Sequence, residues 1–217
     1  MPAAVRRVLG VVVLVLGGAL AIFGAWNAVS LGPSGEARFS VTSKDPGALV
    51  VQPDILNSVG VPVRITARRG DGGGVRLVVA PSTDARAILA RSAVSTVSGV
   101  HFPAGTLDLR ASGVGALTGI STADVWRLSA KDAGTAQLVV NQGRGPETAV
   151  VTSGDGTALR GVTMTLTWAD SAWFFDALAV AVIGSIVAAF ALGDLWNTRP
   201  QGGSPMHPRP RRGRVTT

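Results

Sequence analysis

His101 is the residue in the middle of this chain best suited to moving protons, because an imidazole titrates near neutral pH. The other histidine, His207, lies close to the C-terminus. A single histidine with a serine and an aspartate is enough for a hydrolytic triad, but the sequence holds no Gly-x-Ser-x-Gly nucleophile elbow. We therefore expect His101 to be an ordinary strand-end or surface residue, and we assign no catalytic residue.

Metal and cofactor sites have no recognisable pattern either. The chain has no cysteine, which excludes thiolate ligands, disulfide bonds and a cysteine nucleophile. Asp71 and Asp155 lie in glycine-rich turns without the repeated acidic residues of a calcium loop. Gly113–Gly119 is glycine-rich but has neither dinucleotide-loop spacing nor a Walker lysine, so we expect a mobile loop. We predict no metal and no cofactor.

The charge of the chain is concentrated near its ends. The formal net charge is +7, but residues 36–170 contain 13 basic and 11 acidic side chains and contribute only +2 of it. Most of the remaining arginines flank two apolar segments, and no basic stripe with interleaved aromatic residues exists. This distribution argues against nucleic-acid binding and follows the positive-inside rule of membrane proteins.

The two apolar segments are each long enough to cross a bilayer. The first, residues 8–29, would span about 33 Å as a helix. The second, residues 172–192, is bracketed by Trp173 and Trp196, as in an aromatic belt. Basic residues beside both segments predict cytoplasmic termini. The predicted order is a cytoplasmic N-terminus 1–7, a transmembrane helix 8–29, an extracytoplasmic β-rich domain 30–171, a transmembrane helix 172–192 and a basic, disordered cytoplasmic tail 193–217.

A cleaved signal peptide is the alternative for the first segment. Arg6 and Arg7 would form its basic n-region, and Ala28-Val29-Ser30 is an acceptable cleavage sequence. The apolar run is longer than the usual h-region of about 7 to 15 residues, which favours an uncleaved anchor. The predicted location is therefore the cytoplasmic membrane, as a multi-pass protein whose central domain is extracytoplasmic.

Small residues recur every four positions on both segments, a spacing that lets helix backbones approach closely in lipid. The two helices would pack on each other, self-associate between chains or bind a membrane-protein partner. The basic tail would contact anionic membrane lipid. The recurring small residues are Ala177, Ala181, Ser185, Ala189 and Gly193 in the second segment, and Gly17, Ala21 and Ala25 in the first.

Two carboxylates lie at the ends of the second segment. We expect Asp176 near the outer headgroups and Asp194 near the inner ones. Their simplest role is to be solvated at the interface. The alternative is a proton or ion role, because a charge within the hydrocarbon core is functional by default.

The middle of the chain is patterned for short strands. In Val162–Trp168 apolar residues alternate strictly with threonines, which indicates a half-buried antiparallel strand. Val61–Arg68 alternates similarly, and Pro62 predicts an edge position. Gly70–Gly74 predicts a hairpin to the next strand, Val75–Ala80. Further predicted strands are 38–42, 95–100, 106–110, 125–129, 137–140 and 149–152.

One helix is predicted among these strands. Asp84–Ala93 has helical apolar spacing, and Ser82 and Thr83 offer hydroxyl N-caps. Trp126 and Trp168 are expected in the core. The fold class that follows is a mainly antiparallel, sandwich-like β domain with one helix, flanked by two transmembrane helices.

Three short stretches, Val75–Pro81, Ala87–Leu89 and Asp124–Trp126, precede the closing apolar segment. With this layout the chain resembles uncharacterised two-pass envelope membrane proteins of high-GC actinobacteria. The resemblance covers most of the chain and implies two spans with an outer domain. It supplies no catalytic residues.

Short joins tie the predicted domain to both spans, at Leu31–Glu36 and Ala169–Ser171. We therefore expect a non-enzymatic accessory, adaptor or sensing protein that acts at the outer face of the cytoplasmic membrane. The first alternative is a surface hydrolase or transferase that uses His101 with a nearby serine or aspartate. The second is a small transport component, which would need Asp176 within the membrane.

Overall fold

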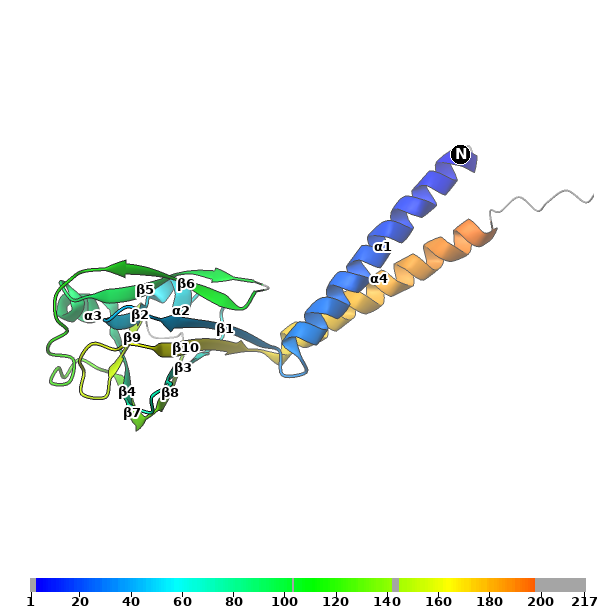
Figure 1. Cartoon of the computed structure of the whole chain (residues 1–217). Coiled ribbons are helices and arrows are strands. Elements are labelled where there is room, and N and C mark those ends of the chain that lie inside the picture. The colour runs from blue at the N-terminus through cyan, green and yellow to red at the C-terminus, as the bar shows by residue number, and fades with distance from the viewer. Residues whose placement is uncertain (1–2, 103, 142–144, 198–217) are drawn as a thin grey trace, which may run out of the picture. The chain divides into compact units, whose positions relative to one another are not determined.

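Two structural units make up the chain, one of helices and one mainly of strands. The computed structural model describes residues 3–102, 104–141 and 145–197. Most of the terminal helices α1 (Ala3–Leu31) and α4 (Ser171–Asn197), up to residue 27 and from residue 176 onward, belongs to the first unit, and residues 28–175 form the second (Figure 1). Two long apolar helices therefore flank a mostly β middle, as predicted. Residues 193–197 belong to α4 rather than to the predicted tail, whose remainder lies outside the described residues.

The contact between α1 and α4 is made mainly by glycine and alanine, while most of the large apolar side chains face outward. A Cβ at Gly17 would lie 2.7 Å from the backbone nitrogen of Ala188, and one at Gly184 would lie 2.4 Å from that of Ala21. No side chain fits at such distances. The contact positions are Gly10, Gly17, Ala21 and Gly24 on α1, and Ala177, Ala181, Gly184, Ala188 and Leu195 on α4.

These contact positions repeat every seven residues, not every four. The predicted small-residue positions are therefore right in part. Ala177 and Ala181 on α4 and Gly17 and Ala21 on α1 lie in the contact, but Ser185 and Ala189 are exposed, and a Cβ at Gly193 would meet nothing within 4 Å. Steps of four move around an α-helix by about 40° each, so the predicted ridge turns away from the neighbouring helix. Alternating steps of three and four keep the contact on one side, as in left-handed helix pairs.

In the part of the central unit that the structure describes, ten strands form one sheet. Their order is β7-β4-β9-β2-β5-β6-β1-β10-β3-β8. Seven of the nine neighbouring pairs are antiparallel, as predicted, and the β2–β5 and β1–β6 pairs are parallel. The strands are β1 (Glu36–Ser43), β2 (Ala48–Val51), β3 (Val63–Arg69), β4 (Gly74–Pro81), β5 (Val94–His101), β6 (Thr106–Ser112), β7 (Leu128–Ala133), β8 (Thr135–Val140), β9 (Glu147–Ser153) and β10 (Val162–Ala169).

The sheet is barrel-like, which corrects the predicted sandwich. β7 and β8 stand at opposite ends of the strand order, yet Gly134 alone joins them. The loop from β3 to β4 bends at the same corner, where the Gly134 N–H donates to the Gly73 carbonyl at 3.1 Å. Gly72 and Gly134 have φ of +71° and +80°, which glycine adopts freely. The β3–β8 pair thus continues around the corner into the β4–β7 pair, and the two ends of the sheet meet (Figure 1).

Because of this corner, two local predictions are wrong. The loop Gly70–Gly74 does not close a hairpin, because β3 pairs with β8 and β10 whereas β4 pairs with β7 and β9. Pro62 does not mark an edge strand, because β3 lies between β10 and β8. The proline precedes the first strand residue, Val63, where no ladder hydrogen bond is required of it.

Within the described residues, two helices rather than one accompany the strands. The predicted helix is α3 (Ser82–Leu89), and α2 (Pro53–Leu56) is additional. The hydroxyl N-cap prediction is wrong, since Pro81 occupies the N-cap position without a side-chain cap. The Ser82 hydroxyl instead donates to the Pro146 carbonyl at 2.8 Å, which ties the start of α3 to the segment before β9.

The central unit has two apolar cores. The larger lies inside the curled sheet and includes Trp168, which is fully buried against Phe39 as predicted for a core residue. The smaller lies on the outer side of β2, β4 and β9, and the partly buried Trp126 packs against it. β2 is therefore buried on both faces. It was not predicted, because its residues are all apolar and do not alternate with polar ones. The predicted strand 125–129 overlaps only the start of β7.

Candidate functional site

His101 is the last residue of β5 and is exposed, as the sequence predicts. Its Nε2 lies 2.6 Å from Oδ2 of Asp108 on β6. Asp108 is paired with Gly99, two residues before His101, so the two side chains meet diagonally across the strands. Within the described residues no serine or threonine hydroxyl is hydrogen-bonded to His101. The pair therefore holds two of the three groups of a hydrolytic triad.

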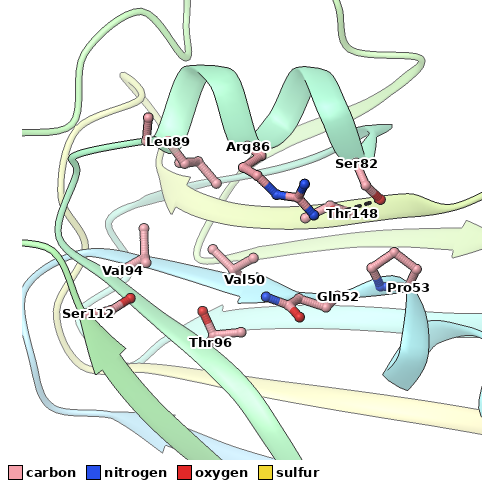
Figure 2. Close-up of a pocket in the computed structure, with 11 residues that line it drawn as sticks. Val50, Gln52, Pro53, Ser82, Arg86, Leu89, Val94, Thr96, Ser112 and Thr148 are labelled. Carbon is pink, nitrogen blue, oxygen red and sulfur yellow. Dashed lines mark hydrogen bonds between the residues drawn. The ribbon is translucent and has the colours of Figure 1, made fainter.

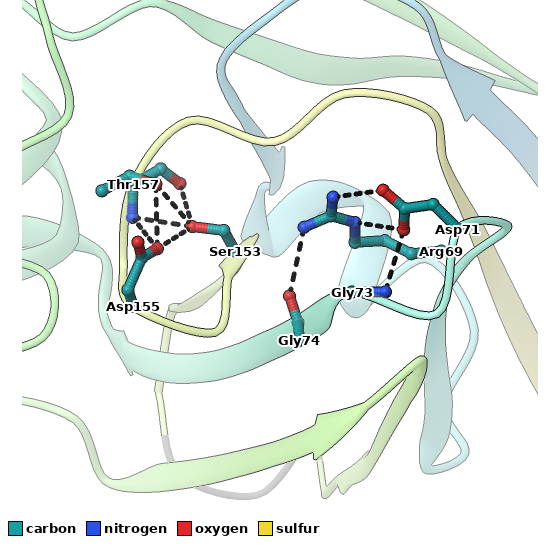
Figure 3. A network of polar contacts seen from close by, with 7 residues as sticks. All are labelled: Arg69, Asp71, Gly73, Gly74, Ser153, Asp155 and Thr157. Carbon is teal, nitrogen blue, oxygen red and sulfur yellow. Dashed lines mark hydrogen bonds and ion pairs between the residues drawn. The ribbon is translucent and has the colours of Figure 1, made fainter.

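Asp71 and Asp155 are both engaged within their own turns (Figure 3). Asp155 accepts hydrogen bonds from the Ser153 hydroxyl and from the N–H and hydroxyl of Thr157, at 3.1 and 2.8 Å for the latter two. These bonds, with Ser153 the strongest, lower the pKa of Asp155 to about 2. No group of three potential metal ligands occurs among the residues that the structure describes.

The Asp71 carboxylate is held mainly by Arg69. The guanidinium donates to both carboxylate oxygens, at 2.9 and 2.5 Å, and the Gly73 N–H donates at 2.9 Å. These bonds hold the pKa of Asp71 below its ordinary value. Arg69 also reaches the Gly74 carbonyl at 3.4 Å (Figure 3), so this group of contacts stabilises the corner of the sheet.

Glu147 is a buried carboxylate at the start of β9. Arg127 forms a two-pronged ion pair with it, one of whose hydrogen bonds is 2.5 Å long. The hydrogen bonds to Glu147 raise the pKa of the Arg127 guanidinium. Because Arg127 directly precedes β7, the pair fastens the end of the long 113–127 loop to β9.

The two carboxylates of α4 differ in their surroundings. Asp194 forms an ion pair with Arg6 of α1, in which the arginine Nε donates to Oδ2 at 3.2 Å. Both side chains of the pair are exposed, so the ion pair is compatible with the solvated position expected for Asp194. Asp176 lies in the first half of α4 and is exposed.

A groove on the outer face of the sheet is the strongest candidate for a binding site (Figure 2). It has a volume of about 220 Å³ and lies between α3 and the strands β2 and β5. Val50, Leu89 and Val94 supply apolar surface. The polar lining residues are Gln52, Ser82, Arg86, Thr96, Ser112 and Thr148.

A second hollow of about 340 Å³ adjoins this groove and shares Gln52, Thr96 and Ser112 with it. It adds Asp54, Ser98 and Arg110 to the lining. In the strand register Thr96 is opposite Val50 on one side and Arg110 on the other. We call the two hollows together the β2–β5–β6 groove. Arg86 lines its α3 side and Arg110 its β6 side.

None of the polar residues of this groove stands out in the sequence as part of a site. They come from α3 and from strand positions or strand ends far apart in the chain, at 52, 86, 96, 110 and 148. On a strand, a solvent-facing threonine or arginine is the ordinary outcome of alternation. Only the parallel pairing of β2 with β5 brings Gln52 and Thr96 to one surface, and no local pattern encodes that pairing.

Comparisons with known proteins do not identify the chain. No protein-family model matches it, and no curated protein or solved structure is similar to it. What the chain does must therefore be inferred from its own geometry.

Proposed function

We propose that this chain is a two-span protein of the cytoplasmic membrane, with cytoplasmic termini and an extracytoplasmic central unit. One observation carries the proposal: side chains such as Leu16, Phe23 and Phe190 are exposed on α1 and α4, while glycine and alanine fill the contact between the helices. In water this arrangement would leave a large apolar surface exposed. In lipid it is the favourable one, because helices there associate through close backbone packing.

Length and hydropathy support the same proposal. The candidate spans Ala4–Leu31 and Ser171–Asn197 have mean hydropathies of 2.6 and 2.3, and little of either is buried. Each is longer than the roughly 20 residues that a bilayer requires. The Arg6–Asp194 pair lies at the ends of the helices assigned to the cytoplasmic side.

We further propose a non-enzymatic role as an accessory, adaptor or sensing subunit for a membrane partner. The connections are short: residues 32–35 join α1 to β1, and Asp170 alone joins β10 to α4. A domain tied this closely to both spans favours partners at the membrane. Its carboxylates Asp71, Asp155 and Glu147 are engaged in holding the fold, and the β2–β5–β6 groove offers a place for recognition.

Single cysteines test the topology, because the chain has none of its own. Val114 is fully exposed in the loop after β6. A membrane-impermeant maleimide should label Val114→Cys in intact cells and Thr217→Cys only after permeabilisation. Labelling of Thr217→Cys from outside would refute the orientation.

A pull-down of the full-length protein from native membranes in mild detergent tests the adaptor role. The expected result is a membrane protein recovered in stoichiometric amount. Recovery of the chain alone would contradict the proposal.

The surface hydrolase or transferase remains the second candidate, because His101 and Asp108 lie within 2.6 Å of each other. It predicts that His101→Ala abolishes a phenotype that the wild-type chain restores to a deletion strain. The adaptor role predicts full restoration, since an exposed histidine at a strand end is then dispensable. Arg160→Ala, at another exposed position, is the control.

A further inference from the structure

Two arginines of the β2–β5–β6 groove are without a partner in the part of the chain that the structure describes. Neither Arg86 nor Arg110 forms an ion pair or a side-chain hydrogen bond there, whereas Arg69 and Arg127 are held by acidic side chains. Figure 2 shows the Arg86 side chain extending from α3 toward the strand that carries Thr148. Free guanidinium donors at both sides of one groove favour an anionic ligand.

Few acidic groups oppose this charge. Asp54 is the carboxylate that lines the groove. Asp108, the acid nearest to Arg110 along β6, is paired with His101. Asp84 on α3 accepts a hydrogen bond from the Thr83 hydroxyl at 3.4 Å. The lining thus carries two positive charges against one negative charge.

The floor between the arginines offers neutral hydrogen-bonding groups. Gln52, Thr96 and Ser112 line both hollows, and within the described residues their side chains make no hydrogen bonds. Ser82 and Thr148 are different, because the Thr148 hydroxyl donates to Ser82 at 3.1 Å. An amide and two free hydroxyls match the hydroxyl groups of a polyol, each of which both donates and accepts.

We propose that the β2–β5–β6 groove binds the phosphate ester of a small polyol. A phosphate monoester carries a charge of about −1.5 to −2 at neutral pH, which suits a groove lined by two arginines better than a single carboxylate would. The polyol would lie on Gln52, Thr96 and Ser112, with its carbon skeleton against Val50. The groove lies within the central unit, so this inference does not depend on the proposed membrane topology.

The same chemistry has two sources, a free metabolite and the headgroup of an anionic lipid or polymer. Calorimetric titration of the full chain in a neutral detergent distinguishes them. The probes are sn-glycerol 3-phosphate, a monoester, and glycerophosphoglycerol, the diester that remains when phosphatidylglycerol is deacylated. If the monoester binds more tightly, the ligand is a free metabolite. If the diester binds more tightly, the ligand is a headgroup. Glycerol and inorganic phosphate are the control probes, because the first carries only the polyol part of the ester and the second only the phosphate.

We expect saturable binding of one ester, weakened about tenfold or more by Arg86→Gln and by Arg110→Gln. Arg160→Gln, exposed outside the groove, should change nothing. Thr96→Val should weaken binding of the ester but not of inorganic phosphate, because it removes only a polyol contact. Unchanged melting temperatures will show that the variants are folded.

The proposal is overturned if neither ester binds, or if binding survives both arginine substitutions. It is also overturned if glycerol binds as well as its phosphate, or if inorganic phosphate binds as tightly as the esters. A failure here leaves the adaptor proposal intact, since the pull-down tests that proposal separately.

Discussion

Gly24 and Ala181 touch backbone to backbone where α1 packs on α4. A Cβ at Gly24 would lie 2.4 Å from the Ala181 nitrogen and 2.7 Å from the Ala177 carbonyl oxygen. A methyl group does not fit there unless the helices separate or shift. The pair is therefore held by close backbone approach, which is the main means of helix association where lipid surrounds the chain.

Gly24→Ala should destabilise the helix pair by about 1 to 3 kcal/mol, the usual effect of overpacking. The measurement is thermal unfolding of the full chain in mild detergent, followed by helical circular dichroism. Gly18→Ala is the matched control on the same helix, because a Cβ there meets nothing within 4 Å. Alanine also favours the helix over glycine, so the control should lose no stability. Equal losses in both variants would show that the contact is absent.

Ala181→Leu and Ser185→Leu should differ, although both replace a small residue of the predicted four-residue ridge. Ala181 lies against Gly24, so a larger side chain there pushes the helices apart. Ser185 is exposed, and its hydroxyl donates to the Ala181 carbonyl at 2.8 Å within α4. Titration with SDS should unfold Ala181→Leu at a lower mole fraction than wild type and leave Ser185→Leu near the wild-type midpoint. The reverse order would place the contact on the other face of α4.

Arg127→Met should destabilise the central unit, because it leaves the Glu147 carboxylate buried without its cation. We expect a loss of about 2 kcal/mol, less than for a fully buried pair, since the Arg127 side chain is 30% exposed. Urea unfolding followed by the fluorescence of Trp126 and Trp168 measures it. The double variant Arg127→Met/Glu147→Met removes both charges and should lose less than the single variant. A double variant as unstable as the single one would assign the loss to packing.

Asp155 should contribute to the acid sensitivity of the fold. Its pKa is lowered from the ordinary 3.8 to about 2 by the Ser153 and Thr157 hydrogen bonds. A carboxylate whose pKa is lower in the folded state stabilises the fold at pH values above its unfolded-state pKa. This contribution to stability is lost as the pH falls through the folded-state pKa. Asp155→Asn should therefore be less stable at neutral pH and should show a shallower loss of stability between pH 4 and pH 2.

Thermal unfolding at a series of pH values measures this slope. Asp124→Asn, an exposed acid in the loop before β7, is the matched control and should keep the wild-type slope. The lowered pKa of Asp71 acts with the same sign, so some acid sensitivity should remain in Asp155→Asn. An unchanged slope in Asp155→Asn would contradict the assignment.

The elements themselves were largely predictable from the chain. Val162–Trp168 was recognised because its apolar face has a period of two, and β10 spans Val162–Ala169. The terminal helices were recognised because long apolar runs are rare outside buried or lipid-facing helices. β2 was missed because burial on both faces removes the alternation. The binding groove was missed altogether, because its residues carry no local signature.

What the sequence determined alone is which segments become helix or strand and which side of each is apolar, since backbone period and hydrophobic burial act over a few neighbouring residues. The tertiary structure decided which segments meet. The corner at Gly134 closes the sheet, the pairing of β2 with β5 builds the groove, and the packing of α1 on α4 selects the contact face of each helix. These choices depend on the fit between surfaces distant in the chain, and the local pattern of polarity does not encode that fit.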